Sequence, residues 1–174
     1  MMYKRFPQVF TYAEMQEFYE FIYRSRYTIG GTDRMGDKAR PHQYLTSVYS
    51  EEDLANMRFL ERIRDPRLLD LIGDREPVKQ FVNLTIPQNV FFSHAHMGED
   101  TLVYYANLDW EQEWAGETII YEENGVDIQT CIPYTPGQIL WMEADSPHAL
   151  RPPAACAPYH RFTLAIFFKS EGKE

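Results

Sequence analysis

Cysteine is almost absent from this chain of 174 residues. Cys131 and Cys156 are its two cysteines, and their wide spacing fits neither a disulfide scaffold nor a zinc knuckle. Such sparse cysteine is typical of a reducing compartment. Long hydrophobic runs are lacking as well: the opening residues, MMYKRFPQVF, do not form a signal peptide, and no stretch is long enough to cross a bilayer. We therefore expect a cytoplasmic protein without a membrane partner.

Positive charge is also scarce. The chain has 17 Lys and Arg against 26 Asp and Glu, for a net charge of -9 at pH 7. A nucleic-acid backbone is held mainly by Lys and Arg, so nucleic acid is not expected as a partner. Internal repeats and low-complexity segments are absent too, whereas 44% hydrophobic and 15% aromatic residues predict a folded globule. The length predicts a single domain over 1–174.

The first part of the chain, 1–76, has the pattern of a helical support. Thr11 and Glu14 form a capping-box pattern, and the apolar residues that follow recur at helical spacing, which predicts a helix near 12–25. The other elements expected here are a loop over Thr28–Pro41, either a lid or a solvated connection, a strand over Gln43–Tyr49, a helix capped by Ser50, and a short helix from Asp65 to Gly73.

From residue 77 to 170 the hydrophobic period changes from 3.6 to 2, in short runs separated by turn residues. Eight such runs preceded by helices favour a mainly β (α+β) fold, a double-stranded β-helix or jelly roll with the N-terminal helices packed on one outer face. A β-sandwich of another topology is the alternative. The expected strands lie near 79–86, 90–96, 101–107, 117–122, 127–132, 138–143, 147–151 and 159–168.

The stretch FFSHAHMGED carries the first chemical signal. His94 and His96 are two residues apart on an expected strand, where side chains of this spacing point to the same face. Two imidazoles aimed at one point are a metal-ligand geometry. The alternative interpretation is that one histidine is simply a hydrogen-bonded core or surface residue.

Three further features follow in order along the chain. The segment YYANLDW (104–110) precedes AGET (115–118), then Pro136 and Gly137 lead through an apolar strand to His148, and Arg161 and Thr163 open the last strand. Taken singly, His148 is typical of a turn histidine and Arg161 of a surface arginine.

Taken together, this order of motifs resembles the Fe(II)/2-oxoglutarate-dependent dioxygenases, in the prolyl 4-hydroxylase-like branch that includes small oxygenases of marine phages and bacteria. The resemblance extends from Asn89 to Phe168 and implies Fe(II), 2-oxoglutarate as cosubstrate, and O2. It places His94 and His148 as iron ligands. It implies that Arg161 binds the distal carboxylate of 2-oxoglutarate, with Thr163 and, less strongly, Tyr105 in the same pocket.

Two features depart from the family: neither Pro133 nor Pro136 has the family's spacing from Gly137, and, more seriously, one ligand position differs. His96 stands where the family has the carboxylate ligand, giving His-x-His instead of His-x-Asp. Three possibilities stay open: His96 is itself the third ligand, as in three-histidine cupin dioxygenases; Glu99 or Asp100 supplies a displaced carboxylate; or the site is no longer catalytic.

The sequence therefore predicts an oxygenase that couples decarboxylation of 2-oxoglutarate to hydroxylation, or a related oxidation, of a small molecule or peptide. Prolyl residues, free amino acids, small metabolites and nucleobases all remain as substrate classes, and no particular oligomeric state is indicated. The alternatives are a three-histidine, cupin-like dioxygenase that does not use 2-oxoglutarate, and a non-catalytic jelly-roll binding protein.

Overall fold

A computed structural model describes residues 3–31 and 44–170 of the chain. The strands are β1 (Tyr3–Phe6), β2 (Thr28–Gly31), β3 (Tyr44–Val48), β4 (Pro77–Thr85), β5 (Glu99–Tyr105), β6 (Thr118–Tyr121), β7 (Ile128–Ile132), β8 (Ile139–Met142), β9 (His148–Leu150) and β10 (Arg161–Lys169). The helices are α1 (Tyr12–Tyr23), α2 (Glu51–Met57) and α3 (Pro66–Ile72), with short 3-10 turns at Leu60–Arg62 and Gln112–Trp114.

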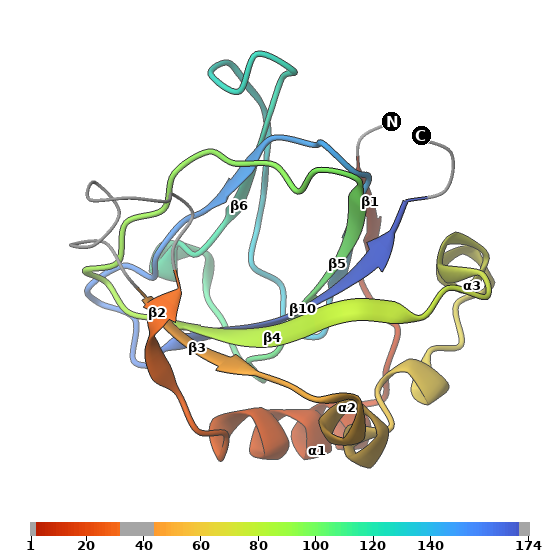
Figure 1. The fold of residues 1–174 in the computed structure, drawn as a ribbon. Coiled ribbons are helices and arrows are strands. Elements are labelled where there is room, and N and C mark those ends of the chain that lie inside the picture. Colours follow the sequence, from red (N-terminus) through yellow and green to blue (C-terminus); the bar gives the residue numbers. More distant parts are fainter. Residues whose placement is uncertain (1–2, 32–43, 171–174) are drawn as a thin grey trace.

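Within these residues the strands form two antiparallel sheets (Figure 1). The larger sheet has seven strands in the order β1-β8-β5-β10-β4-β3-β2, and the smaller has three in the order β7-β6-β9. Most neighbours in the large sheet are distant in sequence, as in β10 between β4 and β5. This is the expected double-stranded β-helix.

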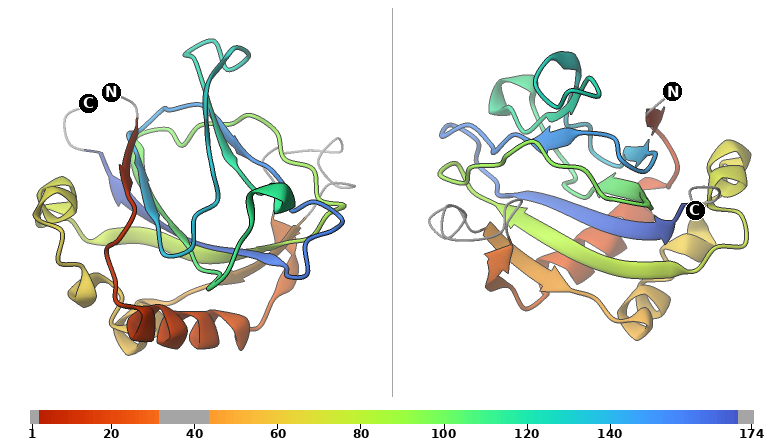
Figure 2. Two further views of the ribbon diagram at one scale, coloured as in Figure 1. Left: turned by 180° about the vertical axis from the view of Figure 1, so that it is seen from behind. Right: turned by 45° about the horizontal axis from the view of Figure 1, so that its top comes forward.

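The two faces of the large sheet have different partners. Alternate residues of β10, such as Phe162 and Ile166, join the larger hydrophobic core together with residues of all three helices. The opposite face of β5 and β8 forms a second, smaller core with Ile120 of β6 and Ile132 of β7. Figure 2 shows α1 on one side of the large sheet and the small sheet on the other. The helices therefore cover the outer face, as expected, and the space between the sheets is left for a site.

The helices begin where the sequence predicts them. Thr11 and Glu14 form the capping box of α1, Ser50 and Asp53 form that of α2, and Asp65 caps α3. The side chain of each cap accepts a hydrogen bond from a backbone N–H that would otherwise have no partner. No helix of the described residues has the length and apolar character needed to span a membrane.

Three local predictions were wrong. Residues 90–96 are not a strand, because their only ladder contact is an isolated bridge between His94 and His148. Residues 28–31, expected as part of a loop, form β2, where pairing with β3 overrides the weak strand propensity of two glycines. The rest of the expected loop, 32–41, lies outside the described residues. Strand β1 was not expected because four residues carry too little alternation to be noticed.

Candidate metal centre and its surroundings

Three histidines from distant parts of the chain meet between the sheets. One ring nitrogen from each of His94, His96 and His148 lies within 4.8 Å of the other two. The ring centroids are 4.5 Å apart for His94 and His148, 5.0 Å for His94 and His96, and 5.1 Å for His96 and His148. Three imidazoles at these distances can hold one transition-metal ion.

The backbone places His94 directly opposite His148. The N–H of His94 donates to the carbonyl of His148 at 3.0 Å, and the N–H of His148 donates to the carbonyl of His94 at 2.9 Å. Residues that exchange both hydrogen bonds in an antiparallel pair project their side chains to the same face. One bridge between two segments therefore brings both rings together, without a longer strand at 90–96.

The carbonyls next to these histidines fix their ring orientation. Nδ1 of His94 lies 3.0 Å from the carbonyl oxygen of Phe92, and Nδ1 of His148 lies 2.9 Å from that of Ser146. A carbonyl only accepts, so each Nδ1 carries the proton and donates it. Nε2 of each ring is then the unprotonated nitrogen, which can act as the metal ligand.

A tight turn holds His96. Its carbonyl accepts from the N–H of Asp145 at 3.1 Å, and Gly98, at φ 68°, turns the chain back so that its N–H donates to Oδ1 of Asp145 at 3.3 Å. The imidazole of His96 meets the ring of Phe167 edge to face, with centroids 4.7 Å apart. Strand geometry is thus not what aims His96 at its neighbours.

Burial keeps the rings of His96 and His148 neutral. Burial and the neighbouring histidines lower the pKa of His148 to about 3, and burial together with His94 and Lys79 lowers the pKa of His96 to about 3. Both groups are therefore unprotonated at neutral pH, so a metal does not have to displace a proton from them.

The two carboxylates that follow His96 lie at the start of β5, and not in a loop as expected, and both are engaged elsewhere. Oε2 of Glu99 lies 2.5 Å from Nζ of Lys79. Asp100 accepts from the N–H of Ala144 at 2.8 Å through Oδ1 and pairs with Arg75 at 2.7 Å through Oδ2. Neither belongs to the three-histidine group. The arrangement favours His96 over Glu99 or Asp100 as the third ligand.

The histidines line a cavity of about 330 Å³ between the sheets. Thr163 lies in its wall, as expected, and so does Asn83, which faces Thr163 across the β4–β10 pair. Oδ1 of Asn83 is buried without a hydrogen-bond partner among the described residues. Sequence reasoning missed Asn83, although its place between Phe81 and Thr85 on the inward face of β4 was a usable signal.

Arg161 lies on the same face of β10, two residues before Thr163. It is 0% exposed; its Nε donates to the carbonyl of Gly116 at 2.8 Å, and its guanidinium lies over the rings of Tyr105 and Tyr134, 5.7 and 5.0 Å from their centroids. Nη1 and Nη2 are buried and have no partner among the described residues. Burial lowers the pKa of Arg161 because it penalises the charged form. An anion bound at Nη1 and Nη2 would therefore stabilise the buried, charged guanidinium.

Arg161 and Tyr105 are not among the residues that line the histidine cavity. The hydroxyl of Tyr105 is hydrogen-bonded to Oγ1 of Thr118 at 2.7 Å, so this tyrosine supports the arginine with its ring. Of the predicted cosubstrate residues, only Thr163 lines the cavity directly. Arg161 lies two residues before Thr163 on the same face of β10, just beyond the residues that line the cavity.

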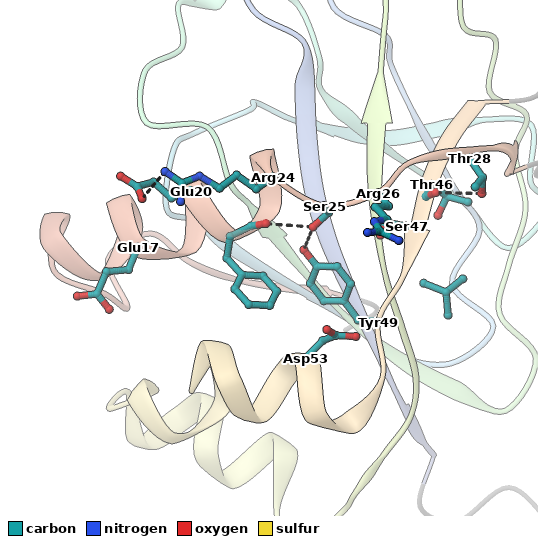
Figure 3. Close-up of a pocket in the computed structure, with 12 residues that line it drawn as sticks. Glu17, Glu20, Arg24, Ser25, Arg26, Thr28, Thr46, Ser47, Tyr49 and Asp53 are labelled. Atoms are coloured by element: carbon teal, nitrogen blue, oxygen red, sulfur yellow. Dashed lines mark hydrogen bonds and ion pairs between the residues drawn. The ribbon is translucent and has the colours of Figure 1, made fainter.

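A second cavity, of about 750 Å³, lies against α1, α2 and β3 (Figure 3). Its wall carries charges of both signs, among them Glu20, Arg24 and Asp53, and the hydroxyls of Ser25 and Tyr49 lie 2.6 Å apart within it. None of the three histidines lines it. The larger cavity therefore has no part in the metal centre.

No protein-family profile matches the sequence, and no curated protein matches it significantly. Solved structures do match. An oxidoreductase of the 2OG-Fe(II) oxygenase family from Burkholderia pseudomallei has a TM-score of 0.71 at 14% identity, covering 96% of this chain and 84% of that one. A Trichoplax adhaerens prolyl hydroxylase, in complex with a peptide fragment of a hypoxia inducible factor, has a TM-score of 0.66 at 14% identity, covering 97% and 84%. HygX from Streptomyces hygroscopicus, with nickel and 2-oxoglutarate bound, has a TM-score of 0.66 at 11% identity, covering 97% and 83%. The chain thus has the double-stranded β-helix fold of the 2-oxoglutarate-dependent Fe(II) oxygenases.

Proposed function

We propose that this protein is an Fe(II)- and 2-oxoglutarate-dependent oxygenase that hydroxylates, or otherwise oxidises, a small molecule or peptide. Support comes from the fold, from the three converging histidines, and above all from the buried guanidinium of Arg161 with two unpartnered nitrogens.

His94, His96 and His148 would hold the metal. Three neutral nitrogen donors within 4.8 Å suit Fe(II). When bound, Fe(II) and 2-oxoglutarate together supply the activation of O2. With His96 in place of a carboxylate, the ligands leave more positive charge at the site than two histidines and an acid would. The carbonyls behind His94 and His148 keep Nε2 of each ring available.

Arg161 would bind the distal carboxylate of 2-oxoglutarate. A guanidinium with both Nη atoms free can grip a carboxylate through two parallel hydrogen bonds. Thr163 would add its hydroxyl from the same strand face, and Asn83 its amide from the facing strand. Tyr105 would act through Arg161, because its ring lies under the guanidinium.

The three-histidine donor set also favours a second candidate, a cupin-like dioxygenase whose substrate chelates the metal without 2-oxoglutarate. The two functions differ in their need for Arg161. A cupin-like dioxygenase would leave Nη1 and Nη2 of Arg161 without a ligand. We therefore prefer the 2-oxoglutarate-dependent oxygenase.

Titration of 2-oxoglutarate into the cobalt-loaded protein, followed by calorimetry, tests the proposal. Arg161→Leu is expected to weaken binding by at least about tenfold, since it removes a charge-assisted pair, while metal content stays unchanged. Arg151→Leu is the matched control, because Arg151 is exposed and reaches only Glu117, at 4.0 Å. Failure of the parent protein to bind 2-oxoglutarate would favour the second candidate.

A further inference from the structure

The charge of the histidine cavity differs from that of the whole chain. The protein has a net charge of -9, yet no Asp or Glu is among the described residues that line the cavity. Among these described residues the one Lys or Arg is Lys79, on the inward face of β4. The described part of the wall of this acidic protein therefore carries a cation and no carboxylate.

Lys79 is connected to the metal centre through the ring of Phe167. Its Nζ lies 4.4 Å from the centroid of Phe167, whose ring packs against His96 at 4.7 Å. The ring of Phe167 also lies beside that of Phe81, with centroids 5.2 Å apart. The ring of Phe167 attracts the ammonium group, so this contact favours a position of Nζ at the histidine end of the cavity. Arg161 stands at the opposite end of the same row of β10 side chains.

The ion pair of Lys79 is replaceable. Its partner Glu99 approaches from outside the cavity lining, and the two side chains are 45% and 26% exposed. Ion pairs this open to solvent contribute little stability. An anion that enters the cavity can therefore take the place of Glu99 at small cost.

Resting on the proposed function, we infer that the substrate carries a negatively charged group, such as a carboxylate, and that Lys79 binds this group beside the metal. Arg161 and the metal would neutralise 2-oxoglutarate at one end, and Lys79 is the cation that the described wall offers to a second anion at the other. The rings of Phe81 and Phe167 offer an apolar wall for the body of that substrate. Lys79 is then a specificity-determining residue.

Benzoate and benzamide are matched probes for this charge. Each is titrated into protein loaded with Co2+ and 2-oxoglutarate under anaerobic conditions, with the cobalt absorption spectrum as the readout. We expect benzoate to bind more tightly than benzamide, and Lys79→Met to weaken benzoate about tenfold, the usual loss for one hydrogen bond to a charged group. Lys79→Arg should keep most of the affinity. Glu99→Gln should tighten benzoate binding, because it removes the competing carboxylate.

Lys4→Met is the control, since it removes the same charge from an exposed position on β1. Equal binding of benzoate and benzamide, no binding of benzoate, or unchanged affinity in Lys79→Met would each overturn the inference while leaving the proposed function intact. Absence of a bound-cobalt spectrum, or no response to 2-oxoglutarate in the parent protein, would instead overturn the proposed function and this inference with it.

Discussion

At the scale of single residues, Tyr104 and Tyr134 show how differently two buried hydroxyls can be placed. Tyr134 accepts from the N–H of Asn107 at 3.0 Å, and its oxygen lies 2.7 Å from Oδ1 of Asn107 and 2.6 Å from the carbonyl oxygen of Phe162. The hydroxyl of Tyr104 is buried among the rings of Phe10, Phe18 and Phe59 without a partner among the described residues. An unpartnered buried polar group destabilises the folded state.

Tyr104→Phe should therefore raise the free energy of unfolding by about 1 kcal/mol, because it removes an oxygen that forms no hydrogen bond. Tyr134→Phe should lower it by about 1–3 kcal/mol, since it leaves the buried backbone N–H of Asn107 without its acceptor, while the Asn107 side chain keeps its hydrogen bonds with Phe162 and His160. Urea denaturation of both variants and the parent gives the two changes. Loss of stability in Tyr104→Phe would mean that its hydroxyl has a partner after all.

Single residues also mark what the sequence could and could not reveal. His148 and Arg161 are unremarkable by themselves and became site residues only through the order of motifs around them. His96 was found, but for the wrong reason: a turn anchored at Asp145 aims it, and no strand pattern encodes that turn. The engagement of Asp100 with Arg75 depends on a side-chain contact between residues 25 apart in sequence.

At the scale of elements, Glu14 joins the start of α1 to the segment before α3. It accepts from the backbone N–H of Thr11 at 2.9 Å and pairs with Arg64 at 2.7 Å. The hydrogen bond with Arg64 is the main reason that the pKa of Glu14 falls from 4.5 to about 2. A carboxyl group with a lowered pKa in the folded state stabilises the fold above its ordinary pKa and loses that contribution on acidification.

The free energy of unfolding should therefore decrease between pH 4.5 and about 2 through protonation of Glu14. Glu14→Gln should be less stable than the parent at pH 6 and nearer to it at pH 2.5. Denaturant titrations at the two pH values measure this difference. A gap that stays constant would show that the charge of Glu14 contributes nothing.

The loop before β6 supports Arg161 through a glycine. Gly116 has φ 87°, and a Cβ there would lie 3.1 Å from the Trp110 ring and 3.3 Å from Cδ of Arg161. Gly116→Ala should cost about 1–3 kcal/mol of stability from the strained backbone and shift the guanidinium. We expect calorimetry to show weakened 2-oxoglutarate binding with unchanged metal content. Parent-like binding of 2-oxoglutarate would show that the arginine tolerates the contact.

Among the elements, those with a local signal were predicted best. Capping residues fixed the starts of α1, α2 and α3. Asn124 and Gly125 are a typical hairpin-turn pair, and they do lie between β6 and β7, where Oδ1 of Asn124 accepts from the N–H groups of Val126 and Asp127. Residues 90–96 alternate like a strand, but a strand also needs a neighbour, and the neighbouring β9 has only three residues. Whether a segment finds a strand to pair with depends on the whole fold, so the sequence of 90–96 alone does not predict it.

At the scale of the whole molecule, the site depends on contacts between distant segments. His94 and His148 are joined by one backbone bridge, β10 carries Thr163 and Arg161 between β4 and β5, and the helices cover the outer face so that the inner face can hold polar groups. The fold class was predictable because alternation and helix signals separate at residue 77. Which polar groups meet was predictable only through the resemblance.

Metal content of the purified protein, measured by elemental analysis after loading with Fe(II) without oxygen, shows whether the three histidines hold the metal. We expect one ion per chain, retained in Glu99→Gln, and lost in large part in both His148→Ala and His96→Ala, because each removes one of three ligands. Circular dichroism spectra of the variants should match the parent, which separates loss of a ligand from loss of the fold. Full metal content in His96→Ala together with loss in Glu99→Gln would contradict the three-histidine site, and full content in His148→Ala would contradict a metal centre at this position.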